Sequence, residues 1–153
     1  MMEQRRSIIK KLVGSLVAIT GLGFAANAKS NAPTEKEAFN VVDDQDVPLF
    51  SGATKFGGMV FIAGKGAHFE GDIKAHTDHV LKELEKELIN AGSSMEKVLK
   101  VNVYLNDIND YKGMNEVFKG RFGNKPPVRS TVAVAKGGVP GDSLVEMDCI
   151  AYV

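Results

Sequence analysis

Two charged residues lie inside segments that otherwise resemble buried strands. Arg129 begins the run Arg129–Val132, and Glu146 lies within the largely apolar segment Val145–Ala151. Strands of a protein core rarely carry charged side chains unless these have a partner or a chemical task. A guanidinium can bind a carboxylate through two parallel hydrogen bonds, and a glutamate can transfer a proton. These two residues therefore predict a site for a small anionic substrate with a proton-transfer group.

Two helices and five strands are expected to position these charges. An apolar stripe at spacings near three, four and seven predicts a helix over Asp72–Asn90, and a second helix is expected over Asp107–Phe122. Apolar or alternating runs predict the strands Phe50–Lys55, Met59–Ala63, Val98–Leu105, Ser130–Val134 and Leu144–Tyr152. This order predicts an α+β domain in which both helices cover one face of a mixed sheet. Because the strands are apolar on both sides, we expect the other face to be covered by oligomerisation.

The two charges also allow a purely structural interpretation. If the last two strands form one hairpin, symmetric pairing places Glu146 near Thr131 or Val132. Opposed residues in a sheet lie about 4.5–5.5 Å apart, so Arg129 could then reach the carboxylate. The pair would in that case be a salt bridge between strands or subunits. The long connection between these strands, residues 135–143, is unusual for a hairpin and weakens this interpretation.

The first 28 residues have the three parts of a secretory signal peptide. Basic residues precede the uncharged run Leu12–Ala26, and the small residues Ala26 and Ala28 fit a signal-peptidase site. The pair Arg5-Arg6 resembles the start of a twin-arginine export signal. These features predict export, with the bacterial periplasm as the expected location. A retained membrane anchor is the alternative for the same segment.

The rest of the chain is expected to hold one domain. Residues 29–46 are predicted to be a polar leader with a short strand at Phe39–Val42, and residues 47–153 the folded domain. Cleavage after residue 28 leaves 15 Lys and Arg against 18 Asp and Glu, a net charge of about −3. Nucleic-acid binding favours a basic face, so no nucleic-acid partner is expected. No membrane association is expected after cleavage.

A few other residues could in principle carry chemistry. His76 and His79 lie one helical turn apart and could share a metal ion with Asp72. Two such histidines are more often part of a solvated helix face, and no metal site is predicted. Cys149, the only cysteine, is expected to be a small core residue rather than a nucleophile.

The C-terminal segments resemble a known family. Pro127–Val132 and Val145–Ala151 are similar to the C-terminal signature of the Rid (YjgF-like, RidA) reactive-intermediate deaminases. The similarity extends back through Asn102–Leu105 and residues 109–115 to Met59–Gly64, and covers nearly all of residues 48–153. This resemblance implies a chorismate-mutase-like subunit and a homotrimer with ligand clefts between subunits.

The resemblance also implies an activity. Archetypal Rid enzymes bind the carboxylate of an imine or enamine such as 2-aminoacrylate, and water then releases ammonia and a 2-keto acid. No cofactor or metal is implied. Carried over by position, Arg129 binds the carboxylate, and Glu146 positions the water or transfers the proton. Thr131 takes the third catalytic position, where many relatives have cysteine.

Five further positions are implied to line the substrate. Gly64 matches a backbone-contact glycine, and Asn115 a helix position near the cleft. Phe50, Ala63 and Lys65 replace the tyrosine, serine and glutamine that are frequent in relatives. These departures, together with the predicted export, suggest two alternatives. The enzyme could act on a different ligand, or the chain could be a non-catalytic module of the same fold that binds a small carboxylate. Ribonuclease activity, reported for some relatives, fits poorly with the acidic charge.

Overall fold

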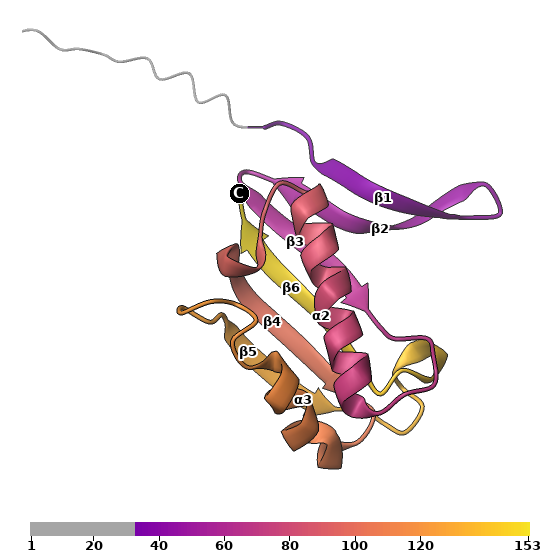
Figure 1. Cartoon of the computed structure of the whole chain (residues 1–153). Helices are drawn as coiled ribbons and strands as arrows, with labels where there is room; N and C mark the ends of the chain where they lie inside the picture. Colours follow the sequence, from indigo (N-terminus) through magenta and orange to yellow (C-terminus); the bar gives the residue numbers. More distant parts are fainter. Residues whose placement is uncertain (1–32) are drawn as a thin grey trace, which may run out of the picture. The chain divides into compact units, whose positions relative to one another are not determined.

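The sheet has six strands in the order β1-β2-β3-β6-β4-β5, and the two helices α2 and α3 cover one of its faces (Figure 1). The structure is a computed structural model and describes residues 33–153. The predicted signal peptide, residues 1–28, lies outside the described residues. The elements follow the chain as β1 Glu37–Asp44, β2 Val47–Phe56, β3 Met59–Lys65, α2 Ile73–Asn90, β4 Val98–Leu105, α3 Tyr111–Phe118, β5 Val128–Ala133 and β6 Val145–Tyr152.

All neighbouring strands are antiparallel except β4 and β5, which are parallel. Parallel neighbours need a crossover connection, and here α3 provides it. β6 then returns on the opposite side of β4 and pairs with both β4 and β3. The hairpin considered for the last two strands is therefore wrong. The long connection before β6 gives the chain enough length to pass β4 and pair on its far side.

The core lies between the sheet and the helices. α2 begins after Asp72, whose side chain accepts a hydrogen bond of 2.8 Å from the backbone N–H of Ala75. The fully buried apolar residues of α2 and of the central strands form a single cluster that includes Val80, Leu81, Leu84, Leu88, Val101, Val103, Met147 and Cys149. The α+β architecture with both helices on one face of a mixed sheet is confirmed.

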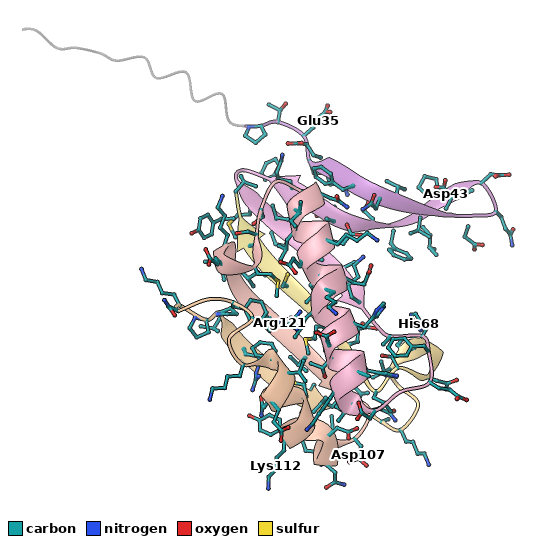
Figure 2. All side chains as sticks on the ribbon, in the orientation of Figure 1. Glu35, Asp43, His68, Asp107, Lys112 and Arg121 are labelled. Carbon is teal, nitrogen blue, oxygen red and sulfur yellow. The ribbon has the colours of Figure 1, made fainter. Side chains whose placement is uncertain are left out.

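Ion pairs join the two helices at the surface. Arg121, which lies just after α3 (Figure 2), donates a hydrogen bond of 2.7 Å from Nη1 to Oδ1 of Asp78. Hydrogen bonds from Lys82 and Arg121 hold the pKa of Asp78 below its usual range. Exposed pairs of this kind stabilise a fold only slightly. The helix pair is therefore held mainly by its buried apolar contacts.

Two elements differ from the expectation. The second helix is shorter than Asp107–Phe122, because a 3₁₀ turn occupies its start and Gly120, at φ +79°, follows its end. The short strand expected at Phe39–Val42 extends to the whole of β1, inside the segment predicted to be a leader. β1 is exposed and held to β2 by backbone pairing, which an apolar pattern does not reveal.

Candidate functional site

Arg129 lies on the helix-covered side of β5, the last strand of the sheet. Its Nη2 donates to the hydroxyl of Tyr111 at 3.3 Å, and Nη1 lies 3.9 Å from the sulfur of Met114. The guanidinium carbon is 4.6 Å from the ring centre of Phe118. Among residues 33–153, no carboxylate forms an ion pair with Arg129. Aromatic residues thus orient the cation and leave most of its donors available.

Thr131 shares this side of β5. It lies beside the buried Val103 of β4, as Arg129 lies beside Val101. The hydroxyl oxygen of Thr131 is buried and has no hydrogen-bond partner within the described chain. Such unpartnered buried groups are uncommon in proteins and need an explanation. Asn115 lies on α3 and follows Met114 in the chain, so it belongs to the helix that contacts Arg129.

Glu146 lies on the opposite face of the sheet. It alternates along β6 with the buried Val145 and Met147, and therefore points away from the helices. Its carboxylate lies directly over Gly64 of β3, so that a Cβ on this glycine would overlap Glu146 and lie 2.8 Å from its Cδ. Tyr104 of β4 is its cross-strand partner. Glycine at position 64 is what allows the carboxylate to approach the backbone this closely.

An acidic network continues along the same open face. Asp148 accepts hydrogen bonds from Asn102 Nδ2 at 2.8 Å and from the Tyr104 hydroxyl at 3.1 Å. Burial raises the pKa of Tyr104, and the hydrogen bond to Asp148 and the charges of Asp148 and Glu146 raise it further. The hydroxyl therefore stays protonated at neutral pH. Tyr104 and Glu146 also line one small cavity with the loop from residue 134 to residue 140.

The three residues that depart from the family pattern lie in different surroundings. Phe50 is on β2 and is 53% exposed, and Ala63 is half-buried beside Gly64. Lys65 instead forms an ion pair of 3.0 Å with Glu87 of α2, in which both side chains are largely buried. The charge of Lys65 is therefore compensated inside the subunit, and its role as a substrate contact stays a prediction.

The predicted site residues do not converge within one subunit. Arg129, on β5, and Phe50, on β2, belong to strands near opposite edges of the sheet. Arg129 and Glu146 lie on opposite faces, because Arg129 shares the face of Val101 while Glu146 shares that of Tyr104. The structural alternative of an Arg129–Glu146 salt bridge within one chain is therefore wrong. The structure contains two separate groups, one around Arg129 and one around Glu146 and Gly64.

Sequence reasoning missed the aromatic support of Arg129 and the hydroxyl beside Glu146. Tyr111, Met114 and Phe118 were recognisable as one apolar side of a helix, but nothing in their spacing indicated a cation against them. Tyr104 was recognisable only as an alternating strand residue. Its position opposite Glu146 depends on the order of strands in the sheet.

The histidines and the cysteine have structural surroundings. Both ring nitrogens of the buried His76 are within hydrogen-bond distance of backbone groups, and His79 packs its ring against Phe69. Within residues 33–153, no group of three or more His, Cys, Asp or Glu side chains is arranged to hold a metal ion. Burial raises the pKa of the Cys149 thiol to about 12, which disfavours the thiolate needed of a nucleophile.

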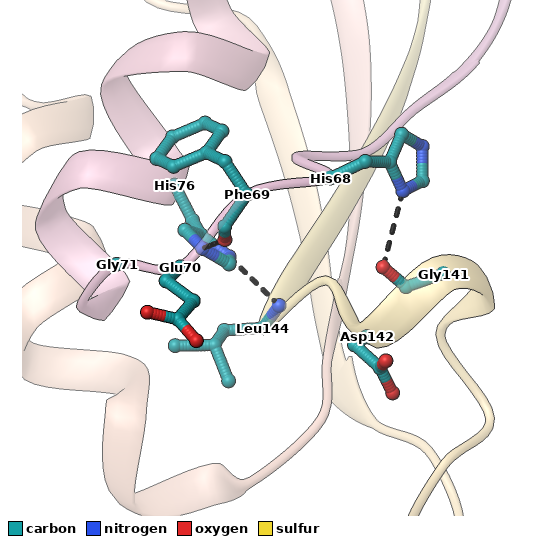
Figure 3. Close-up of a pocket in the computed structure, with 8 residues that line it drawn as sticks. All are labelled: His68, Phe69, Glu70, Gly71, His76, Gly141, Asp142 and Leu144. Atoms are coloured by element: carbon teal, nitrogen blue, oxygen red, sulfur yellow. Dashed lines mark hydrogen bonds between the residues drawn. The ribbon is translucent and has the colours of Figure 1, made fainter.

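A larger cavity of about 530 Å³ lies near the start of β6. It is lined by the loop after β3 and by the segment that leads into β6, with His76 from α2 at its base (Figure 3). Glu70 and Asp142, which also line it, are exposed.

None of the helices in the described part of the chain is long and apolar enough to cross a membrane.

Comparisons with known proteins agree over most of the described residues. The family model described as endoribonuclease L-PSP matches residues 46–153. The chain is 41% identical over 110 residues to a RutC family protein of Pyrococcus abyssi, covering 67% of this chain and 85% of that protein. The structure of a YjgF/YER057c/UK114 family member from Mycobacterium tuberculosis superposes with a TM-score of 0.67 at 30% identity, covering 78% of this chain and 100% of that one.

The relatives also correct one expectation. The mmf2 protein of Schizosaccharomyces pombe, 38% identical over 110 residues, covering 67% of this chain and 86% of that protein, is a mitochondrial protein, and so is mmf1 of the same organism. Others come from archaea. These relatives contradict the predicted periplasmic location. The family model and the relatives together show that the chain belongs to the endoribonuclease L-PSP family, also known as the YjgF, RutC or Rid family.

Proposed function

We propose that this chain hydrolyses a small imine or enamine that bears a carboxylate, of the 2-aminoacrylate type, to a 2-keto acid and ammonia. The observation that carries the proposal is the state of Arg129. Its guanidinium is oriented by Tyr111 and Phe118 but has no carboxylate partner within residues 33–153. A fixed cation with free donors suits a ligand carboxylate. Family membership supports the same chemistry.

The reaction needs few groups. An enamine first takes a proton on carbon and becomes an imine, which is already activated toward attack by water. Water adds to the imine carbon, a proton moves to nitrogen, and the carbon–nitrogen bond breaks to leave the keto acid and ammonia. In this proposal Arg129 holds the carboxylate, and Glu146 transfers the protons and orients the water.

The site is proposed to form between subunits of a homotrimer. One subunit would contribute Arg129, Thr131 and Asn115, and its neighbour Glu146 and Gly64, with the neighbour's half-buried Ala63 and exposed Phe50 near the same wall. The separation of the two groups on opposite faces supports a composite site, since neither group is complete alone.

Exposed apolar side chains on the open face and on the β1–β2 hairpin favour association. Phe61 is 45% exposed, Val132 51% and Phe50 53%. Large exposed apolar side chains that cluster on one surface commonly mark an interface. The mass of the full chain in solution, measured by light scattering, tests the trimer directly. A monomer at assay concentration would contradict a composite site.

The activity is tested with an enamine generated in situ, by following both ammonia and keto-acid release. Arg129→Ala is expected to lower kcat/KM by about a hundredfold or more, because charge-assisted hydrogen bonds to the substrate carboxylate are lost. The matched control is Arg121→Ala, which removes an arginine that is ion-paired with Asp78 on the helix side. Equal activity of wild type and Arg129→Ala would contradict the proposal.

A non-catalytic module that binds a small carboxylate is the second candidate. Phe50 favours it, because this side chain lacks the hydroxyl frequent in archetypal enzymes and faces solvent in the subunit. Calorimetry with pyruvate as the probe separates the two candidates. Binding that requires Arg129, without any turnover of the enamine, would favour the module. RNA cleavage, to which the family name refers, is not proposed, since the open face carries the acids Glu146 and Asp148.

A further inference from the structure

Side-chain contacts join the loop after β3 to the segment that leads into β6. The backbone N–H of Leu144 donates to Nδ1 of His76 at 3.1 Å, and Nε2 of the same ring lies 2.8 Å from the carbonyl oxygen of Phe69 (Figure 3). His76 is only 2% exposed. One buried imidazole on α2 thus connects two separate segments of backbone. We call these two hydrogen bonds the His76 clamp.

A second connection runs beside the clamp. The hydroxyl oxygen of Ser143 accepts from the backbone N–H of Ala67 at 2.8 Å and donates to the carbonyl of Val145 at 2.7 Å. Unlike His76, this serine cannot change its charge. It supports the same approach of the two segments but cannot respond to acidification.

The clamp fits one tautomer of a neutral His76 ring. Since Nδ1 accepts a hydrogen bond from a backbone N–H, it carries no proton, and Nε2 must then be the protonated nitrogen that donates to the Phe69 carbonyl. Neutral imidazole therefore satisfies both backbone groups. A second proton would go to Nδ1, where it would face the N–H of Leu144 and remove that hydrogen bond.

The clamp acts where strand pairing is interrupted. The β3–β6 ladder is regular up to Ile62 and Cys149, and its register shifts before the next pair, Lys65 and Met147. Gly64 lies inside this interruption, with the Glu146 carboxylate directly over it. Regular pairing with β3 is lost at this point, whereas pairing with β4 continues through Glu146 and Val145. On the β3 side, the hydrogen bonds at residues 143 and 144 take its place just before Glu146.

We propose that His76 is a positioning residue that holds Glu146 over Gly64 while neutral and loosens it when protonated. This proposal rests on the proposed role of Glu146 in catalysis. A proton on Nδ1 would remove the hydrogen bond from the Leu144 N–H, so this hydrogen bond is expected to weaken on acidification.

The titratable groups around His76 come from three segments. Asp72 caps its own helix, where His79 also lies one turn away. His68 and Glu70 lie on the loop after β3, and Asp142 lies on the segment before β6. None of these side chains is a hydrogen-bond partner of the His76 ring, whose two nitrogens meet backbone groups.

The test uses the full chain and three variants. His76→Gln keeps an acceptor and a donor but cannot be protonated, and His76→Leu removes both hydrogen bonds. His79→Gln is the control, because it changes a nearby histidine whose ring packs against Phe69 and takes no part in the clamp. Two quantities are followed from about pH 8 to pH 5. These are hydrogen exchange of the Leu144 amide, corrected for its intrinsic pH dependence, and kcat and KM for the enamine.

In wild type and in His79→Gln, protection of the Leu144 amide is expected to fall on acidification by about fivefold or more, the size of one lost hydrogen bond. kcat should fall in parallel, with KM nearly constant because the Arg129 group is untouched. In His76→Gln, both Leu144 protection and kcat should stay constant over this pH range. His76→Leu should show the low protection at every pH; if this variant does not fold, His76→Gln still decides.

Two results would overturn the proposal. One is an identical pH dependence of Leu144 protection in wild type and His76→Gln. The other is a His76→Gln variant in which Leu144 protection no longer depends on pH but kcat keeps the pH profile of wild type. The clamp would then have no effect on Glu146. If no protein releases ammonia at any pH, the proposed function is wrong, and Leu144 exchange alone decides whether His76 protonation opens the clamp.

Discussion

The two charged groups of the subunit are built in contrasting ways. Arg129 lies on the helix side of β5 against aromatic rings, and its charge has no opposite partner in residues 33–153. Glu146 lies on the open face over a glycine, next to a tyrosine whose hydroxyl is bound to a second acid. The first arrangement leaves donors free for a carboxylate, and the second places a proton carrier against backbone. In the proposed reaction, each group would provide one half of the chemistry, and neither would provide both.

Among substitutions in the group around Glu146 and Gly64, that of Glu146 itself should lower activity most. Glu146→Gln keeps the shape of the side chain but cannot take up or release the proton. kcat should fall by about a hundredfold while KM changes little, because the carboxylate of the substrate is bound elsewhere. Steady-state kinetics of ammonia release measure both constants. A rise in KM at unchanged kcat would mean that Glu146 binds substrate and does not transfer protons.

Gly64→Ala tests the close approach of Glu146 to the backbone. The added methyl would overlap the carboxylate, which can rotate away, so stability should change little while kcat falls about tenfold. Gly66→Ala is the matched control, since a Cβ there meets only ordinary contacts at 3.4 Å. Wild-type activity in Gly64→Ala would show that the position of the carboxylate over Gly64 is unimportant.

Tyr104→Phe tests the hydroxyl next to Glu146. It removes the donor to Asp148 but retains the ring, and kcat should fall by only about threefold to fivefold. Thermal unfolding should show a loss of about 1 kcal/mol in the free energy of unfolding, because the partly buried Asp148 loses one of its two donors. A loss of activity as large as that of Glu146→Gln would instead place Tyr104 in direct contact with substrate.

Lys65→Met should have the smallest effect on activity. It leaves Glu87, which is largely buried, without its cation, so the free energy of unfolding should fall by about 1–3 kcal/mol while kcat/KM stays near wild type. Lys55→Met is the control, since the more exposed Lys55–Glu37 pair should contribute far less. A large rise in KM in Lys65→Met at full stability would support the role that the family pattern implied for Lys65.

The local sequence pattern predicted the helices and strands themselves better than it predicted which strands lie side by side. The apolar spacing of Asp72–Asn90 and the alternation in Val98–Leu105 give the observed helix and strand, because burial on one face repeats with a regular period. The period does not say which strands pair. Glu146 was therefore considered near Thr131, whereas β4 lies between them in the sheet.

The candidate site shows the same limit. Arg129 and Glu146 could be singled out because a charge in an apolar strand is conspicuous in the sequence. The partner of Lys65 could not be identified in this way. In the sequence, Glu87 is one of several acids in the predicted helix Asp72–Asn90, and its pairing with Lys65 depends on how α2 lies on the sheet. The clamp by His76 likewise depends on two loops that meet only in the fold.

The central claim is that Arg129 and Glu146 act together across a subunit boundary. Inactive Arg129→Ala and Glu146→Gln chains are mixed in equal amounts, unfolded and refolded together, and ammonia release from the enamine is measured. In random trimers about one quarter of the interfaces would pair an intact Arg129 with an intact Glu146, so activity should return to about a quarter of wild type. A mixture that stays as inactive as its two components, although the subunits exchange, would contradict the account.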